Sequence, residues 1–75
     1  MKRTYYLFNP GRLSRKDNTL CFQPVDADGN EMPPKYLPVE GTDDLYIFGS
    51  LDANSALYNF LGKNDIPVHF FDYHE

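Results

Sequence analysis

The chain has 75 residues, a formal net charge of −4 at pH 7 and 41% hydrophobic residues. This length predicts a single domain, and a domain of this size buries only ~60% of the surface that its unfolded chain exposes. Its negative charge argues against a free-standing nucleic-acid-binding protein, because most non-specific affinity comes from neutralising phosphates. Its single cysteine excludes an internal disulfide and indicates a reducing compartment.

The sequence contains no apolar run long enough for a signal peptide or a membrane span. We therefore expect a cytoplasmic protein without a membrane partner. Six Phe and six Tyr compensate for the short chain, because each aromatic side chain can bury ~150–250 Å². So many rings on so short a chain also suggest that some aromatic surface belongs to an interface.

The first part of the chain predicts a meander of three short antiparallel strands. Residues 4–8 are β-branched and aromatic, as strands prefer. Residues 12–16 and 19–23 alternate between apolar and polar side chains, and each follows a turn sequence, at 9–11 and 17–18.

The middle of the chain predicts a loop and two further strands. Residues 24–34 are polar, and Asp28-Gly29 can form the turn of a hairpin. Residues 36–39 read as a strand, which Pro38 places at an edge of the sheet. Residues 45–48 are apolar on both faces and predict a central strand.

Residues 52–63 predict one amphipathic helix. Three apolar side chains lie on one face of it: Leu57, Phe60 and Leu61. Asp52 is the expected N-cap, and Lys63 lies in the last turn, where a cation is favourable. Asn64 is expected to end the helix in the left-handed conformation, and Pro67 prevents its continuation.

Residues 68–72 predict a final strand, which the connection through the helix places parallel to residues 45–48. The predicted fold class is mainly β (α+β). It is a small β-sandwich or curled antiparallel sheet of about six strands, with one helix near residues 52–63 packed at one end. Residues 1–75 form one domain, and because the last strand is so apolar we expect a longer protein.

The basic side chains are unevenly distributed. Residues 1–16 contain no Asp or Glu and hold five of the seven Lys and Arg residues. Arg12, Arg15 and Lys16 are therefore the candidate contacts to DNA phosphates, which need cations but no base readout. The alternative is that they keep an exposed strand soluble and unpaired.

Potential metal ligands gather at the C-terminal end, at His69, Asp72, His74 and Glu75. Because strand side chains alternate, His69 and Asp72 point to opposite faces, and we predict no metal site. Asp43-Asp44 is interpreted as a turn former rather than an acid–base pair.

Three further features are not interpreted as sites. Residues 26–31 lack the ligand spacing of a calcium loop, and the glycines are too isolated for a phosphate loop. Cys21 has no activating base nearby in the sequence, which argues against a catalytic thiol. We therefore predict no catalytic residue and no cofactor in this chain.

Several short motifs follow one another in a specific order and spacing. They are Tyr6-Leu7-Phe8, Gly11-Arg12-Leu13-Ser14-Arg15, Asn18-Thr19-Leu20, Tyr36-Leu37-Pro38-Val39, Leu45-Tyr46-Ile47-Phe48-Gly49, Asn59-Phe60-Leu61 and Ile66-Pro67-Val68-His69-Phe70-Phe71. In this order they resemble the N-terminal β-domain of the CRISPR-associated integrase (Cas-one) family, over nearly the whole chain. The acidic loop at 24–34 is longer than the family pattern.

The resemblance implies a metal-dependent DNA endonuclease and integrase that inserts foreign DNA spacers into a CRISPR array. It implies that Mg²⁺ or Mn²⁺ is held by a helical C-terminal domain, none of whose ligand positions lies in this chain. It also implies that the β-domain forms a homodimer, contributes to a platform for double-stranded DNA and works with the Cas-two partner protein.

Two alternatives remain from the residues themselves. One is a self-contained β-rich module that binds protein through its aromatic surface. The other is a small oligonucleotide-binding barrel that uses Tyr5, Tyr46 or Phe70 as stacking platforms.

Overall fold

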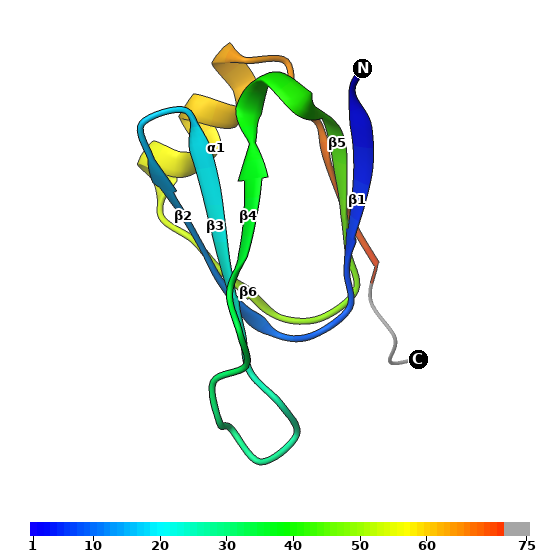
Figure 1. The fold of residues 1–75 in the computed structure, drawn as a ribbon, viewed down its shortest axis with the longest axis vertical. Coiled ribbons are helices and arrows are strands. Elements are labelled where there is room, and N and C mark those ends of the chain that lie inside the picture. Colours follow the sequence, from blue (N-terminus) through cyan, green and yellow to red (C-terminus); the bar gives the residue numbers. More distant parts are fainter. Residues whose placement is uncertain (72–75) are drawn as a thin grey trace.

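The structure, a computed structural model, describes residues 1–71, which form two facing β-sheets and one helix (Figure 1). The first sheet has three parallel strands in the order β1 (Arg3–Leu7), β5 (Thr42–Ile47), β7 (Val68–Phe70). The second has four strands in the order β4 (Lys35–Pro38), β3 (Thr19–Pro24), β2 (Gly11–Lys16), β6 (Leu51–Asp52). The predicted mainly-β sandwich is confirmed.

The two sheets are joined by two chain segments that cross side by side. Before the crossing β1 pairs with β5, with Leu7 opposite Ile47; after it β2 pairs with β6, with Gly11 opposite Leu51. Backbone hydrogen bonds continue through it, from Phe48 N–H to the Leu7 carbonyl (2.9 Å) and from Gly11 N–H to the Ser50 carbonyl (3.0 Å). Figure 1 shows both segments running together below the sheets.

The predicted three-strand meander is therefore wrong in its first strand. The hairpin of β2 and β3 is present, with Lys16 opposite Thr19 and a positive φ at Asp17. However, β1 lies in the other sheet, because residues 8–10 carry the chain across rather than turning it back. Backbone groups along this crossing bond to residues 48–50, so the two strands cannot form a local hairpin.

The core lies between the two sheets and under the helix. Strand alternation supplies it, as in β3, where every second residue is buried. Its fully or nearly fully buried apolar side chains are Leu7, Leu13, Leu20, Phe22, Leu37, Val39, Leu45, Ile47, Leu57, Leu61 and Ile66. The buried hydroxyl of Thr42 donates to the Pro38 carbonyl (2.7 Å), which satisfies the one buried polar side chain among the described residues.

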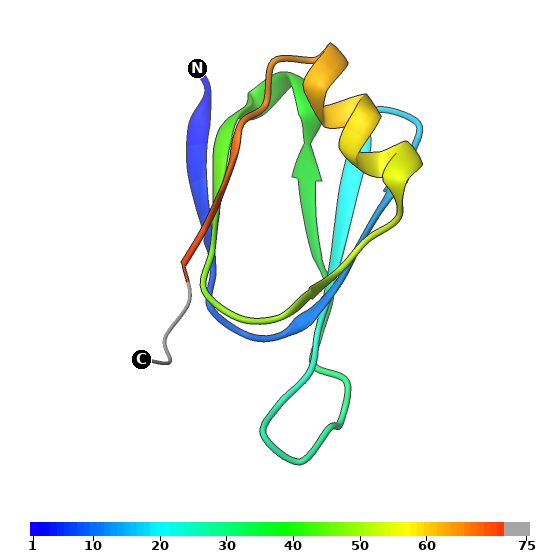
Figure 2. The same ribbon diagram turned by 180° about the vertical axis from the view of Figure 1, so that it is seen from behind.

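The one α-helix within residues 1–71, α1 (Ser55–Lys63), connects β6 to β7 and closes one end of the sandwich (Figure 2). Leu57 and Leu61 are buried and Phe60 is half-buried, so the predicted apolar face is confirmed. The parallel pairing of β7 with β5 is also confirmed.

Both predicted caps of α1 are wrong. Asn54 is the N-cap, and its side-chain oxygen accepts from Leu57 N–H at 2.8 Å. Asp52 cannot take that role because Leu51–Asp52 pairs with β2 as strand β6. At the other end Asn64 has φ −99, and Asp65 adopts the left-handed conformation instead, with φ 55.

Two predictions for the middle of the chain are tested directly. Residues 25–31 form a hairpin whose turn contains Gly29 at φ 85, as Asp28-Gly29 predicted. Asp43 and Asp44, predicted to form a turn, lie within β5, because a short 3-10 helix, η1 (Val39–Gly41), already turns the chain. Pro38 ends the edge strand β4, as expected.

No helix within residues 1–71 has the length and apolar content needed to cross a bilayer.

The close approach of the two crossing segments predicts that a methyl group added at Gly49 will destabilise the fold. A Cβ on Gly49 would lie 2.8 Å from the Pro10 nitrogen and 3.0 Å from the Asn9 carbonyl carbon. Because both are backbone atoms, we expect Gly49→Ala to lower the free energy of unfolding by ~1–3 kcal/mol. Urea denaturation followed by circular dichroism measures this change.

Gly62→Ala is the matched control, because a Cβ at Gly62 in α1 meets no atom within 4 Å. There the better helix propensity of alanine should raise stability by ~0.4–1 kcal/mol. Equal effects of both substitutions would contradict the close approach of the two crossing segments.

The burial of α1 predicts unequal effects along its apolar face. Leu57 is 5% exposed, so Leu57→Ala should cost ~2–5 kcal/mol by opening a cavity beneath the helix. Phe60 is only half-buried, and Phe60→Ala should cost less. Thermal melts showing the reverse order would place the helix on the sheets by a different face.

Candidate nucleic-acid interface

The candidate DNA contacts lie on β2, at the boundary between the four-stranded sheet and the helix. Leu13 points into the core, so strand alternation places its neighbours Arg12 and Ser14 on the outer face, together with Lys16. Arg15 shares the side of Leu13, toward α1. The three predicted cations therefore do not share one face: Arg12 and Lys16 lie on the outer face, and Arg15 does not.

Arg12 is held by an ion pair across strands. Its Nε donates to Asp52 Oδ2 at 3.0 Å, which follows from the pairing of β2 with β6. Both side chains are mostly exposed, at 73% and 69%, so the pair contributes little to stability. A phosphate oxygen can replace the Asp52 carboxylate as the acceptor for Arg12.

Arg15 has two partners within the domain. Its guanidinium carbon lies 4.0 Å from the centroid of the Phe60 ring, and its Nη1 donates to the Asp17 carbonyl at 3.1 Å. The first contact ties β2 to α1, and the second ties it to the β2–β3 turn. Arg15 therefore has a structural role that the sequence did not indicate, while its remaining N–H groups stay able to donate.

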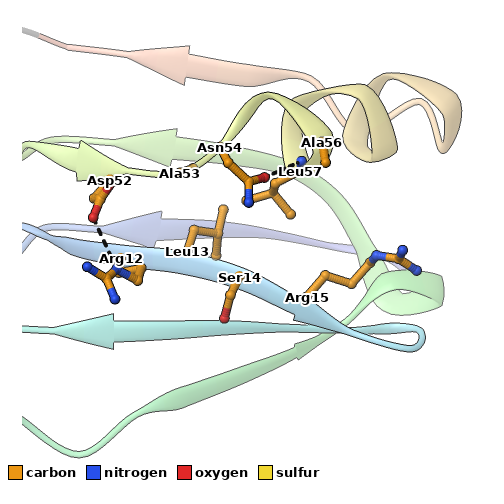
Figure 3. Close-up of a pocket in the computed structure, with 9 residues that line it drawn as sticks. All are labelled: Arg12, Leu13, Ser14, Arg15, Asp52, Ala53, Asn54, Ala56 and Leu57. Atoms are coloured by element: carbon orange, nitrogen blue, oxygen red, sulfur yellow. Dashed lines mark hydrogen bonds and ion pairs between the residues drawn. The ribbon is translucent and has the colours of Figure 1, made fainter.

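A cleft of about 520 Å³ separates β2 from the start of α1 (Figure 3). Arg12 and Arg15 lie toward its two ends, and Leu13 and Leu57 contribute its apolar part. Asn54 at its rim is occupied in capping the helix. The arrangement can accept an anion next to Arg12, but it contains no pair of groups suited to acid–base catalysis.

The outer face of the three-stranded sheet is a feature that the sequence analysis did not assign. We define the ring face by six side chains: Tyr6, Phe8, Tyr46, Phe48, His69 and Phe71. Their rings contact one another at centroid distances of 4.5 to 6.3 Å. The signal in the sequence was aromatic residues two apart in three segments, which only the parallel pairing brings together.

His69, a candidate metal ligand, lies at the polar end of the ring face. Its Nε2 is 3.5 Å from Asp44 Oδ2, and the Thr4 hydroxyl donates to the other oxygen of Asp44. Within residues 1–71 no three His, Cys, Asp or Glu side chains gather closely enough to hold a metal ion. Asp72, His74 and Glu75 lie outside the described residues.

The other residues considered in the sequence have structural roles. The Asp26 carboxylate accepts backbone N–H groups of Asp28 and Asn30, both at 2.9 Å, and so stabilises its own loop. Cys21 is a half-buried free thiol in β3. A Cβ on Gly11 would lie 2.4 Å from the Gln23 carbonyl oxygen, so Gly11 is required for close strand approach.

The oligonucleotide-binding barrel is wrong, because the strands within residues 1–71 form two separate sheets and no closed barrel. Its proposed stacking residues also do not share a face. Tyr5 packs against the core, whereas Tyr46 lies on the ring face. Strand alternation places Phe70 opposite His69 and hence away from the ring face.

Fold and site together define a small mainly-β domain with a cation-bearing outer face on its four-stranded sheet. The family model of CRISPR associated protein Cas1 matches residues 5–75. A CRISPR-associated endonuclease Cas1 from Thermodesulfovibrio yellowstonii is 40% identical over 99% of this chain and 21% of its own length. One from Moorella thermoacetica is 43% identical over 96% of this chain and 21% of its own length.

Solved structures give the same result. A CAS1 protein from Thermotoga maritima has a TM-score of 0.76 at 40% identity, over 93% of this chain and 21% of that chain. A casposase bound to its integration product has a TM-score of 0.72 at 18% identity, over 97% of this chain and 23% of that chain, and thus shares the fold.

The chain belongs to the CRISPR associated protein Cas1 family and corresponds to its N-terminal β-domain. The resemblance found in the sequence is thereby confirmed. The chain spans about a fifth of the length of the relatives that it matches.

Proposed function

We propose that this domain is a dimerisation and DNA-scaffold domain of a metal-dependent CRISPR adaptation integrase and endonuclease. In this proposal the outer face of the four-stranded sheet contacts the phosphates of double-stranded DNA. The supporting observation is the placement of Arg12 and Lys16 on that face, in a family whose matched members are named endonucleases. A strand face with cations and no base-reading helix suits contacts that position a duplex without reading its sequence.

The catalytic chemistry is assigned to parts of the protein beyond this domain. Residues 1–71 contain no group of three His, Cys, Asp or Glu side chains that could hold a metal ion, which supports placing the Mg²⁺ or Mn²⁺ that the family implies outside the described residues. No catalytic step is therefore assigned to any residue described. The role of the domain is to hold DNA and partner subunits in place.

The remaining parts of the proposal rest on family membership. They are insertion of foreign spacers into a CRISPR array, a homodimer formed through the β-domain, the Cas-two partner and a cytoplasmic location. The ring face supports one second candidate function, a module that binds protein through aromatic surface, because several of its rings are strongly exposed. The two functions predict different responses to loss of the cations on β2.

Charge removal on β2 tests the contact to DNA. Lys16→Gln should weaken binding of the 75-residue chain to a short duplex and lower the slope of log K against log salt by ~1, because one phosphate contact is lost. Lys63→Gln at the end of α1 makes the same charge change elsewhere and should have a smaller effect. Fluorescence anisotropy at several salt concentrations measures both.

In the same assay Asp52→Asn should change the affinity for duplex DNA in the opposite direction. Removing the carboxylate that holds Arg12 frees its guanidinium for phosphate, so affinity for duplex should rise. Stability should change by no more than ~1 kcal/mol, since the pair is exposed. If neither Lys16→Gln nor Asp52→Asn changes the affinity for duplex DNA, the result would favour the protein-binding module.

The chain alone should be catalytically silent. We expect no cleavage of a supercoiled plasmid when Mn²⁺ is added to the 75-residue chain, because residues 1–71 hold no cluster of metal ligands. Gel electrophoresis of the plasmid after incubation measures this. Metal-dependent nicking that persists through repurification would show that the domain has an active site of its own.

A further inference from the structure

The outer face of the four-stranded sheet carries a row of three side chains next to its cations. Ser14 pairs with Cys21, and Cys21 pairs with Tyr36, so the three residues lie side by side across β2, β3 and β4. Their sequence neighbours Leu13 and Leu37 are buried, so strand alternation turns the row outward. Tyr36 is 66% exposed at the end of the row. A hydroxyl, a thiol and a phenol therefore share the face on which the basic side chains lie.

A hollow of about 520 Å³ lies over this row, near the turn from β2 to β3. Its lining residues are Ser14, Lys16, Asp17, Thr19, Cys21 and Tyr36. Lys16 pairs with Thr19 in the next row of the same face, which brings one ammonium group and three hydroxyl groups to the border of one hollow. Arg12 is not among these residues, so the hollow is a position separate from the cleft beside α1.

The cation of the hollow is available to a ligand. Lys16 makes no ion pair within residues 1–71, whereas Arg12 is held by Asp52. Asp17 is the one carboxylate among the lining residues, and its backbone carbonyl accepts from Arg15. An anion that enters the hollow therefore meets an ammonium group that no carboxylate of the described chain holds.

The chemistry of the lining fits a sugar–phosphate unit of a DNA strand. Phosphate oxygens accept hydrogen bonds from Lys, Ser, Thr and Tyr side chains, and such contacts position a protein on a duplex. The exposed ring of Tyr36 adds an apolar surface for the deoxyribose. A stable protein interface has an apolar centre, and none of the six lining residues is a large aliphatic side chain. The hollow is therefore better suited to DNA than to a protein partner.

We propose that this hollow binds one backbone phosphate of double-stranded DNA, with Lys16 as its cation and the hydroxyls of Tyr36 and Ser14 as hydrogen-bond donors. The inference rests on the proposed contact of this sheet face to DNA. It extends that contact from the cations of β2 across β3 to the exposed edge strand β4. Because the hydroxyl groups are uncharged, they add affinity without adding to its salt dependence.

Cys21 allows the hollow to be probed directly, because it is the single cysteine of the chain and lies between Ser14 and Tyr36. The 75-residue chain is alkylated with iodoacetamide, an uncharged reagent, at low salt with and without a blunt duplex, and the product is followed by mass spectrometry. With duplex at ten times its Kd, alkylation should be ~tenfold slower, because only unbound chain reacts. A rate that duplex leaves unchanged would overturn the site.

A thiol on the opposite side of the sandwich is the matched control for protection. Tyr6 is 51% exposed on β1, in the three-stranded sheet. The double variant Cys21→Ser, Tyr6→Cys should be alkylated at the same rate with and without duplex. Equal protection of both thiols would mean that DNA does not select the hollow, and would also contradict the proposal.

Removal of one hydroxyl group tests the role of Tyr36. Tyr36→Phe should weaken duplex binding by about two- to tenfold at every salt concentration and leave the slope of log K against log salt unchanged, because the lost hydrogen bond carries no counterion. Tyr6→Phe removes the same group from the other sheet and should bind like wild type. Fluorescence anisotropy measures both variants, and thermal melts establish that both are folded.

Asp17→Asn tests the opposing charge in the same assay. Asp17 has φ 55, a conformation that asparagine also tolerates, so the turn should be retained. Removing the carboxylate from the lining should strengthen duplex binding. Binding that weakens instead, in a variant whose melting temperature is unchanged, would contradict a phosphate in the hollow.

The contrary results separate this inference from the proposed contact to DNA. If Lys16→Gln lowers the salt slope while Cys21 stays unprotected and Tyr36→Phe binds like wild type, DNA contacts β2 outside the hollow and only this inference is wrong. If the chain binds no duplex at low salt, both are wrong. If Tyr36→Ser abolishes binding, Tyr36→Phe retains it and a single strand binds more tightly than a duplex, the ring stacks on a base and the phosphate site is refuted.

Discussion

The structure depends on the backbone contact between two segments that cross together from one sheet to the other. Because residues 8–10 lie against residues 48–50, the pairing of β1 with β5 continues as the pairing of β2 with β6. Gly49 permits this approach, since its hydrogen in place of a Cβ lets the Pro10 backbone come close. This contact fixes which strands share a sheet, and so determines what each outer face carries.

The two outer faces differ in chemistry because of that arrangement. On the four-stranded sheet Arg12 and Lys16 stand among polar side chains, beside a cleft that reaches the start of α1. On the three-stranded sheet the ring face gathers aromatic side chains around a single Asp44–His69 pair. The cations and the rings are therefore separated onto opposite faces of one small sandwich.

Much of the secondary structure was readable from local pattern. The alternation of Leu20 and Phe22 identified a buried strand. The spacing of Leu57 and Leu61 identified a helix with one buried face, and Pro67 marked the end of that helix. The caps were wrong because capping depends on where the preceding strand ends. Asp52 and Asn54 are equally good caps by residue type, and only the pairing of β6 with β2 decides between them.

The sequence by itself determined the fold class, the core face of the helix and the family, because these depend on residue type and spacing along the chain. Tertiary structure alone decided that β1 joins β5 rather than β2, since that choice depends on contacts between residues about forty positions apart. The pairing of β5 with β1 and β7 also brought the six rings together, and the packing of α1 beside β2 placed Phe60 against Arg15. Local propensity contains no information on such distant partners. The residues that make up the ring face and the cation-bearing face could therefore not be predicted before the strand pairing was known.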